Sequence, residues 1–222
     1  MPKKNKRKVS DDTFYVTRHM GRLLGSHQVF RDGGSVGVGV SGGLVSSTLL
    51  WVLHLRHRWV PVRTELVPIH LGPGPIPDEL NVVCHRIGAD CRVLAREPDL
   101  ALEEQLVAIA ADLGLDAMAV GQVIEDRAAA VLGSLGFDGA LTTLPTVVKA
   151  PGRPTLVRPF AKLPEDAVLR AATDNAIEGR APRRGRDREW MEKLLSAVPG
   201  DRHVLLANLV NAPERVKKDY LV

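Results

Sequence analysis

The clearest chemical signal in the 222-residue sequence is a short loop rich in glycine and hydroxyl residues. Gly42 and Gly43 are adjacent, and the hydroxyl residues around them are Ser41, Ser46, Ser47 and Thr48. Paired glycines let a backbone approach an anion closely and adopt positive φ angles. A helical pattern follows the loop, and the unpaired N–H groups and positive dipole end of a helix favour phosphate. We predict a phosphate-binding loop; the alternative is an ordinary strand-to-helix turn.

The spacing within this loop excludes two common nucleotide motifs. No Gly-Lys-Ser/Thr sequence follows the glycines, so the loop is not a Walker loop. The dinucleotide fingerprint Gly-x-Gly-x-x-Gly is also absent after the preceding apolar run. Gly37 and Gly39 lie inside that run, where glycine admits a closely packed neighbour.

Short apolar runs alternate with helical patterns along most of the chain, which is typical of α/β proteins. The uncharged run 35–40 predicts a strand buried on both faces. The expected strands are 35–40, 64–69, 91–95, 116–121 and 155–160, and the expected helices are 13–30, 49–57, 78–87, 99–113, 125–135, 164–177, 187–197 and 202–211. This order predicts a doubly wound, mostly parallel five-stranded sheet with a helical C-terminal extension. Such sheets bind ligands at the carboxyl ends of their strands, where the glycine loop would lie.

Several stretches, in the right order, resemble one family. The loop VSGGLVSSTLL closely resembles the SGGxDS loop of the PP-loop ATP pyrophosphatases, and the segment GQVIEDRAAAVL (121–132) resembles their GHHxDDxxET segment. The segment 156–172 resembles their I-R-P-L segment, with Arg158 and Pro159 matching. The likeness covers residues 13–212 and is nearest to the tRNA 2-thiocytidine and tRNA-lysidine synthetases. It implies an adenine nucleotide alpha-hydrolase-like fold of the HUP type.

The resemblance also implies roles for individual residues. ATP would be bound by Ser41, Gly42, Gly43, Ser46, Ser47, His70 and Gly121, and catalysis would involve Ser46, Asp126 and Arg158. Asp126 and Glu125 would hold Mg²⁺, although an acidic pair at the start of a helix equally fits simple dipole stabilisation. The implied chemistry is adenylylation of a tRNA base with release of pyrophosphate, followed by displacement of AMP.

The departures from the family pattern are equally informative. The acid that would help hold magnesium in the loop is Val45 here, and its loss could cost several kcal/mol of transition-state stabilisation. The two C-x-x-C pairs of thiocytidine synthetases are missing, so no iron–sulfur cluster is expected. Six residues separate Cys84 from Cys91, a spacing that favours structural thiols over a metal pair. The alternative is therefore a degenerate, non-catalytic nucleotide- or RNA-binding protein.

Positive charge is concentrated outside the central part of the sequence. Five of the 30 basic residues lie in the arm, namely Lys3, Lys4, Lys6, Arg7 and Lys8, and removing them leaves a near balance with the 26 acidic residues. A second cluster contains Arg180, Arg183, Arg184, Arg186 and Arg188. Both clusters suit contacts with RNA phosphates, and we expect tRNA contacts from the arm and from Arg183, Arg184 and Arg186. Solubilising charge is the alternative.

Composition and charge patterning bound the remaining possibilities. Hydrophobic residues make up 45% of the chain, which excludes global disorder. No apolar run reaches the length of a membrane helix, no apolar segment follows the basic start, and two cysteines favour a reducing cytoplasm. We expect a basic arm (1–10), a nucleotide-binding domain (11–178) and a basic loop with C-terminal helices (179–222). The resemblance leaves a homodimer open.

Overall fold

A computed structural model describes residues 10–141, 143–182 and 184–220, and the side chains of those residues up to Pro213. The predicted basic arm lies outside the described residues. A six-stranded sheet in the order β3-β2-β1-β4-β6-β5 forms the centre of the molecule. The strands are β1 (Ser35–Gly39), β2 (Glu65–Leu71), β3 (Arg92–Leu94), β4 (Ala117–Val120), β5 (Val147–Val148) and β6 (Thr155–Val157). All pairings are parallel except that of β5 with β6, so the α/β, mostly parallel prediction is confirmed.

The number of strands differs from the prediction by one. β5 lies in the Gly- and Pro-containing connector, where no strand was expected, and Val148 pairs with Leu156 in antiparallel register. Two residues are too short for a period-2 pattern to be visible in the sequence. The edge strand therefore depends on its pairing with β6 rather than on a local signal.

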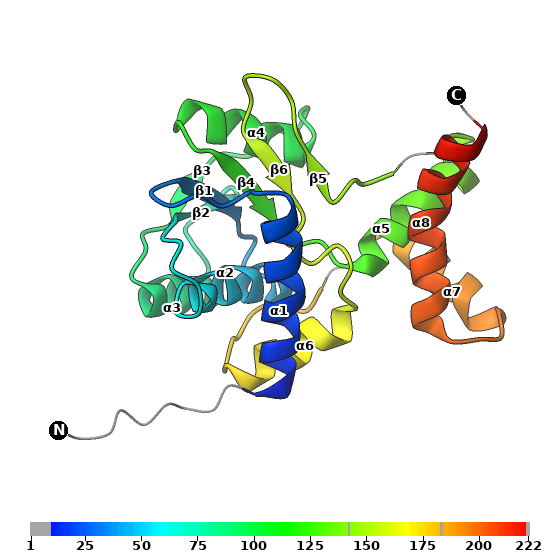
Figure 1. Cartoon of the computed structure of the whole chain (residues 1–222), viewed down its shortest axis with the longest axis horizontal. Coiled ribbons are helices and arrows are strands. Elements are labelled where there is room, and N and C mark those ends of the chain that lie inside the picture. The colour runs from blue at the N-terminus through cyan, green and yellow to red at the C-terminus, as the bar shows by residue number, and fades with distance from the viewer. Residues whose placement is uncertain (1–9, 142, 183, 221–222) are drawn as a thin grey trace.

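Helices cover both faces of the sheet, as a doubly wound fold requires (Figure 1). The helices are α1 (Asp11–Ser26), α2 (Leu44–Arg56), α3 (Asp78–Ile87), α4 (Leu102–Asp112), α5 (Ile124–Gly133), α6 (Glu165–Asp174), α7 (Arg186–Ala197) and α8 (Arg202–Tyr220), and a π-helical turn η1 (Ser134–Asp138) continues α5. Helices α1, α2, α3 and α6 pack together on one face, and α4 lies on the other. In the described chain no helix is both long and apolar enough to span a bilayer.

Helix α2 begins earlier than the periodicity predicted. It starts at Leu44, directly after Gly43, instead of at Leu49. Nine of its residues are buried because α1, α3 and α6 surround it. A helix that is buried on all sides carries no clear 3.6-residue pattern, so the sequence predicts a loop where the first turn of α2 lies. The early start places Ser46 in the first turn of α2.

The C-terminal helices pack away from the sheet. Helices α7 and α8 lie against α5 and form the right-hand part of the molecule in Figure 1. Their contact buries a separate apolar cluster in which Met191 and Leu206 pack against Ala128. The helical C-terminal extension therefore has its own small core.

Candidate functional site

A cavity of about 670 Å³ lies at the carboxyl ends of β1, β2 and β4. Its walls come from the glycine loop, the segment after β2, the start of α4, the end of β4, residues 180–182 and Arg188. This position is where parallel α/β sheets bind their ligands. Its volume falls in the usual range for small-molecule sites.

The glycine loop is held in shape by its own hydroxyl groups. The Ser46 hydroxyl accepts a hydrogen bond from the Ser41 amide at 3.1 Å and donates one to the Gly43 carbonyl at 3.1 Å. The Ser41 hydroxyl accepts from the Gly43 amide at 3.3 Å. As second and third residues of α2, Val45 and Ser46 have amides without an intrahelical acceptor. The loop therefore presents helix N–H groups toward the cavity.

Two glycines allow close backbone approaches around the loop. Gly42 has φ +74°, and a Cβ there would lie 2.8 Å from Cγ of Pro77. A Cβ on Gly121, at the end of β4, would lie 3.3 Å from the Ser46 amide nitrogen. Gly121 thus keeps the start of α2 accessible from the β4 side.

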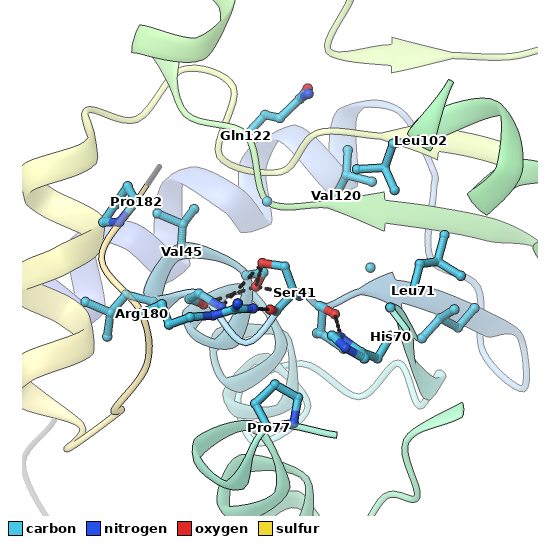
Figure 2. Close-up of a pocket in the computed structure, with 18 of the residues that line it drawn as sticks. Ser41, Val45, His70, Leu71, Pro77, Leu102, Val120, Gln122, Arg180 and Pro182 are labelled. Carbon is cyan, nitrogen blue, oxygen red and sulfur yellow. Dashed lines mark hydrogen bonds between the residues drawn. The ribbon is translucent and has the colours of Figure 1, made fainter. Parts of the chain in front are cut away.

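A C-terminal segment crosses the loop, and we call residues 179–182 the strap. The Arg180 amide donates to the Gly42 carbonyl at 3.0 Å, and the Leu44 amide donates to the Arg180 carbonyl at 2.9 Å. The Arg180 guanidinium also donates to the Ser41 carbonyl (Figure 2). A Cβ on Gly179 would lie only 3.0 Å from the Gly42 carbonyl oxygen, so the strap needs glycine there. The strap fixes a positive side chain beside the phosphate loop.

His70 lies at the end of β2 and is buried in the cavity wall. Its Nδ1 lies 2.8 Å from the Val40 carbonyl oxygen, which requires Nδ1 to be the protonated donor (Figure 2). In the neutral ring, Nε2 is then an acceptor. His70 is therefore positioned by the backbone that leads into the glycine loop.

The opposite wall contains a buried ionic cluster. Arg188 of α7 donates to Asp126 at 2.9 Å and to Glu165 at 2.9 Å. Asp126 also accepts from the Val123 amide at 2.9 Å, which fixes the first turn of α5. All three charged side chains line the cavity, and Arg188 and Glu165 are buried. The cluster ties the C-terminal helices to the nucleotide-binding region.

Two of the charged residues predicted for the site, Glu125 and Arg158, do not line the cavity. Both carboxylate oxygens of Glu125 accept from the Glu165 amide, at 3.1 and 3.0 Å, so Glu125 stabilises the start of α6 and is not beside Asp126 in the cavity. Burial raises the pKa of this carboxyl group. Arg158 is 2% exposed and donates to Gln122 at 2.5 Å and to Glu103, both of which do line the cavity. Arg158 is thus a positioning residue.

The remaining described residues that were predicted for the ATP site fall into two groups, those that line the cavity and those that lie behind its wall. The cavity is lined by Ser41, Gly43, Ser46, His70, Gly121 and Asp126. Gly42 and Ser47 are not in the lining: Gly42 forms the turn beneath the strap, and Ser47 is fully buried below the loop. A helix that begins at Leu44 turns successive side chains by 100°, which points Ser46 and Ser47 in different directions.

The predicted RNA contacts are only partly described. The lysines and arginine of the arm and Arg183 lie outside the described residues. Arg184 and Arg186 are exposed, and the Arg186 guanidinium stacks 4.0 Å from the centre of the Phe137 ring. The Phe137 and Trp190 rings lie 5.2 Å apart. An exposed arginine and aromatic surface therefore continues from the strap.

The cavity fits ATP better than it fits a metal ion. Helix amides, hydroxyl groups and Arg180 are donors suited to phosphate oxygens. The described carboxylates of the wall are engaged instead: Glu103 pairs with Arg158, and Arg188 pairs with both Asp126 and Glu165. Val45, which lies beside Ser41 and Arg180, adds no ligand (Figure 2). Among the described residues, no group of three acidic, histidine or cysteine side chains could hold a metal.

The two cysteines lie elsewhere. Cys84 is buried in the main core and Cys91 precedes β3, and neither lines the cavity. A hydrogen bond with Cys91, together with burial, raises the pKa of the Cys84 thiol. This placement fits the structural role predicted from their spacing.

Comparisons with known proteins find relatives that match nearly the whole chain. No protein-family model matches the chain. It is 25% identical over 244 residues to a tRNA-cytidine(32) 2-sulfurtransferase of Syntrophotalea carbinolica, covering 96% of this chain and 94% of the relative. It is also 25% identical to the enzyme of the same name from Geotalea daltonii, over 92% of this chain and 95% of the relative.

A solved structure shares the fold. The U34-tRNA thiolase NcsA from Methanococcus maripaludis, solved with its [4Fe-4S] cluster, superposes with a TM-score of 0.76 at 19% identity, covering 94% of this chain and 80% of that one. The HUP-type α/β fold is therefore confirmed, and the sequence relatives confirm the resemblance to the tRNA-modifying PP-loop ATP pyrophosphatases.

Sequence reasoning missed the residues that complete the cavity. Arg180 and Arg188 were visible only as members of a basic cluster, and Glu103 and Gln122 carried no signal at all. One sequence feature distinguishes Arg180 from the rest of the cluster: Gly179 precedes it, and glycine often marks a close backbone approach. The pairing of Arg188 with acids distant in sequence was not readable.

Proposed function

We propose that this chain, which resembles the PP-loop ATP pyrophosphatases over nearly its whole length, binds ATP in the cavity and uses it to modify a base of a tRNA. The observation that carries the proposal is the hydroxyl-fixed glycine loop, which presents the amides of Val45 and Ser46 at the start of α2. Helix N–H groups at such a position bind phosphate. The names of the similar enzymes suggest tRNA as the substrate.

The proposed chemistry is adenylylation. A carbonyl oxygen of the base attacks the α-phosphorus of ATP in line with the bond to the bridging oxygen. That bond breaks with its electron pair, and pyrophosphate leaves. A sulfide or amine nucleophile then adds at the activated ring carbon, and AMP departs with the original base oxygen.

The described residues have distinct parts in this scheme. Ser41, Gly43 and Ser46 would bind the pyrophosphate, and Gly121 keeps the amide of Ser46 within reach. His70 offers Nε2 as an acceptor on the β2 side of the cavity. Preorganised donors at a leaving group are the main means by which such sites stabilise developing charge. Asp126, paired with Arg188, fixes the wall opposite the loop.

The tRNA would approach from the side of the C-terminal extension. Arg184 and Arg186 are exposed there, and the Arg186 guanidinium stacks on the Phe137 ring, which packs against Trp190. Arginine and aromatic groups together suit unpaired bases, because the rings stack and the guanidinium binds phosphate. The strap and this surface are consecutive in sequence, so RNA bound there would lie near the cavity mouth. We place the activity in the cytoplasm, where tRNA is found.

Pyrophosphate release tests the proposal. The full chain is incubated with ATP and bulk tRNA, with and without a sulfide donor, and pyrophosphate is measured. We expect release that depends on tRNA and is lost in Gly43→Val, because a branched side chain would fill space beside the Ser41 hydroxyl. Gly25→Ala is the control, since a Cβ on Gly25 meets nothing within 4 Å. Equal release by Gly43→Val would contradict the assignment.

A further inference from the structure

We propose that Arg180 provides the positive charge at the pyrophosphate of ATP that a metal-binding acid would otherwise recruit, so that this site binds ATP without a protein-held Mg²⁺. The proposal rests on the ATP site proposed above and assigns its cation. The ligand class is the pyrophosphate of a nucleoside triphosphate. Three observations support it.

The first observation is that each described carboxylate that lines the cavity is already paired with a buried arginine. One oxygen of Glu103 and one of Glu165 have no hydrogen-bond partner, but both are buried. Val45, the second residue of α2, adds no carboxylate at the glycine loop. Glu103 accepts from Arg158, and Asp126 accepts from Arg188, as does Glu165. Magnesium prefers carboxylate oxygens in near-octahedral geometry. Releasing Glu103 would leave buried Arg158 without its carboxylate partner, and releasing Asp126 or Glu165 would remove one of the two partners of buried Arg188. Breaking such buried pairs is strongly unfavourable.

The second observation is that Arg180 is fixed on the loop by its main chain. Its amide and carbonyl bond to Gly42 and Leu44, on either side of Gly43. Gly179 allows this approach, because any side chain there would meet loop backbone atoms within 3.0 to 3.3 Å. The position of Arg180 therefore does not depend on its side chain, although the guanidinium also donates to the Ser41 carbonyl.

The third observation concerns the donors that remain. The Arg180 side chain is exposed at the cavity wall, and one bond to Ser41 leaves most of its five N–H donors available. Across the cavity, Nε of buried Arg188 has no hydrogen-bond partner. Guanidinium groups bind phosphate oxygens in bidentate geometry. Of the two arginines, Arg180 is therefore the exposed one with donors available beside the glycine loop, whereas Arg188 is buried in its ion pairs with Asp126 and Glu165.

The test is calorimetric titration of the full chain with ATP, once with excess Mg²⁺ and once with excess EDTA. We expect the wild-type affinity to change little between the two conditions. R180Q should weaken ATP binding by about tenfold to a hundredfold in EDTA, as loss of a charged hydrogen bond predicts. R170Q is the matched control, because Arg170 is an exposed arginine on α6 that does not line the cavity.

A gain of magnesium dependence gives the reverse test. V45D places a carboxylate on the second residue of α2, and we expect its ATP affinity to fall in EDTA and recover with Mg²⁺. Because R180Q could disturb the strap, wild-type binding of inorganic pyrophosphate in EDTA is measured as well. Competition between pyrophosphate and ATP under those conditions is expected.

The outcomes are separable. Wild-type binding that collapses in EDTA, or R180Q that binds ATP as the wild type does, would overturn the role of Arg180 while leaving the ATP site intact. No ATP binding under either condition would overturn the proposed function and this inference together. Magnesium-independent binding that is lost in R180Q and kept in R170Q supports both.

Discussion

The cavity has two walls at neighbouring strand ends, and they are built in opposite ways. At the end of β1, backbone amides and hydroxyl groups face the cavity, and the one charged group fixed there is Arg180. At the end of β4, charged groups are numerous and paired with one another, because Arg188 binds both Asp126 and Glu165.

This difference separates ligand binding from structural support. Donors on the β1 wall have hydrogen-bonding capacity left for an anion, whereas the acids on the β4 wall are held in ion pairs with Arg188. Buried ion pairs are costly to break but add little net stability by being present. The β4 wall therefore joins α5, α6 and α7, and the β1 wall carries the phosphate site. The following predictions test each wall, starting with the largest expected effect.

Arg188→Ala should unfold the β4 wall. It leaves the carboxylates of Asp126 and Glu165 without their buried partner, which costs about 3 kcal/mol or more of unfolding free energy. Arg170→Ala, which removes exposed ion pairs with Asp12 and Asp166, should cost far less, because solvent screens such pairs. Urea unfolding measures both. Similar losses of unfolding free energy in the two variants would show that the ion pairs of Arg188 do not stabilise the packing of α5, α6 and α7.

Gly179→Val should damage the β1 wall without comparable loss of stability. The new side chain would push the strap away from Gly42 and Leu44 and carry Arg180 with it. We expect ATP affinity to fall at least about tenfold, equivalent to about 1.4 kcal/mol. Calorimetry with ATP is the measurement, and Gly25→Ala is again the control. Unchanged affinity would mean that the strap is not part of the phosphate site.

The double variant Arg184→Ala and Arg186→Ala tests the surface beyond the strap. If both side chains contact phosphates, the slope of log affinity against log salt for tRNA should become shallower by about 1 to 2. Filter binding over a range of salt measures this slope. The exposed pair Arg22 and Arg153 serves as control after the same replacement. Equal slopes in both double variants would identify the cluster as solubilising charge.

Glu125→Gln should have the smallest effect, and it depends on pH. Burial raises the folded-state pKa of Glu125, so its contribution to stability is fully present at low pH and is lost as pH rises through that raised pKa. The variant should therefore gain stability relative to the wild type as pH rises from about 4 to about 8. Thermal unfolding across this range checks the sign, with the exposed Glu104→Gln as control. A relative loss at high pH would contradict it.

The sequence predicted the β1 wall far better than the β4 wall. Glycine pairs and hydroxyls at a strand end form a local signal, so the sequence alone pointed to Ser41, Gly43 and Ser46, which the structure places in the cavity lining. Ion pairs between distant segments leave no such signal. The sequence therefore predicted Mg²⁺ binding by Glu125 as well as by Asp126, whereas in the structure Glu125 accepts a hydrogen bond from the first residue of α6. The same limit applies to β5, whose two residues form a strand only by pairing with β6.

The central claim is that ATP binds at the glycine loop after β1. Calorimetric titration of ATP into the wild type and into Gly43→Val tests it most directly, with Gly25→Ala and circular dichroism as controls for folding. We predict saturable binding to the wild type and to Gly25→Ala, and none to Gly43→Val. Equal ATP affinity in a folded Gly43→Val protein would contradict the account.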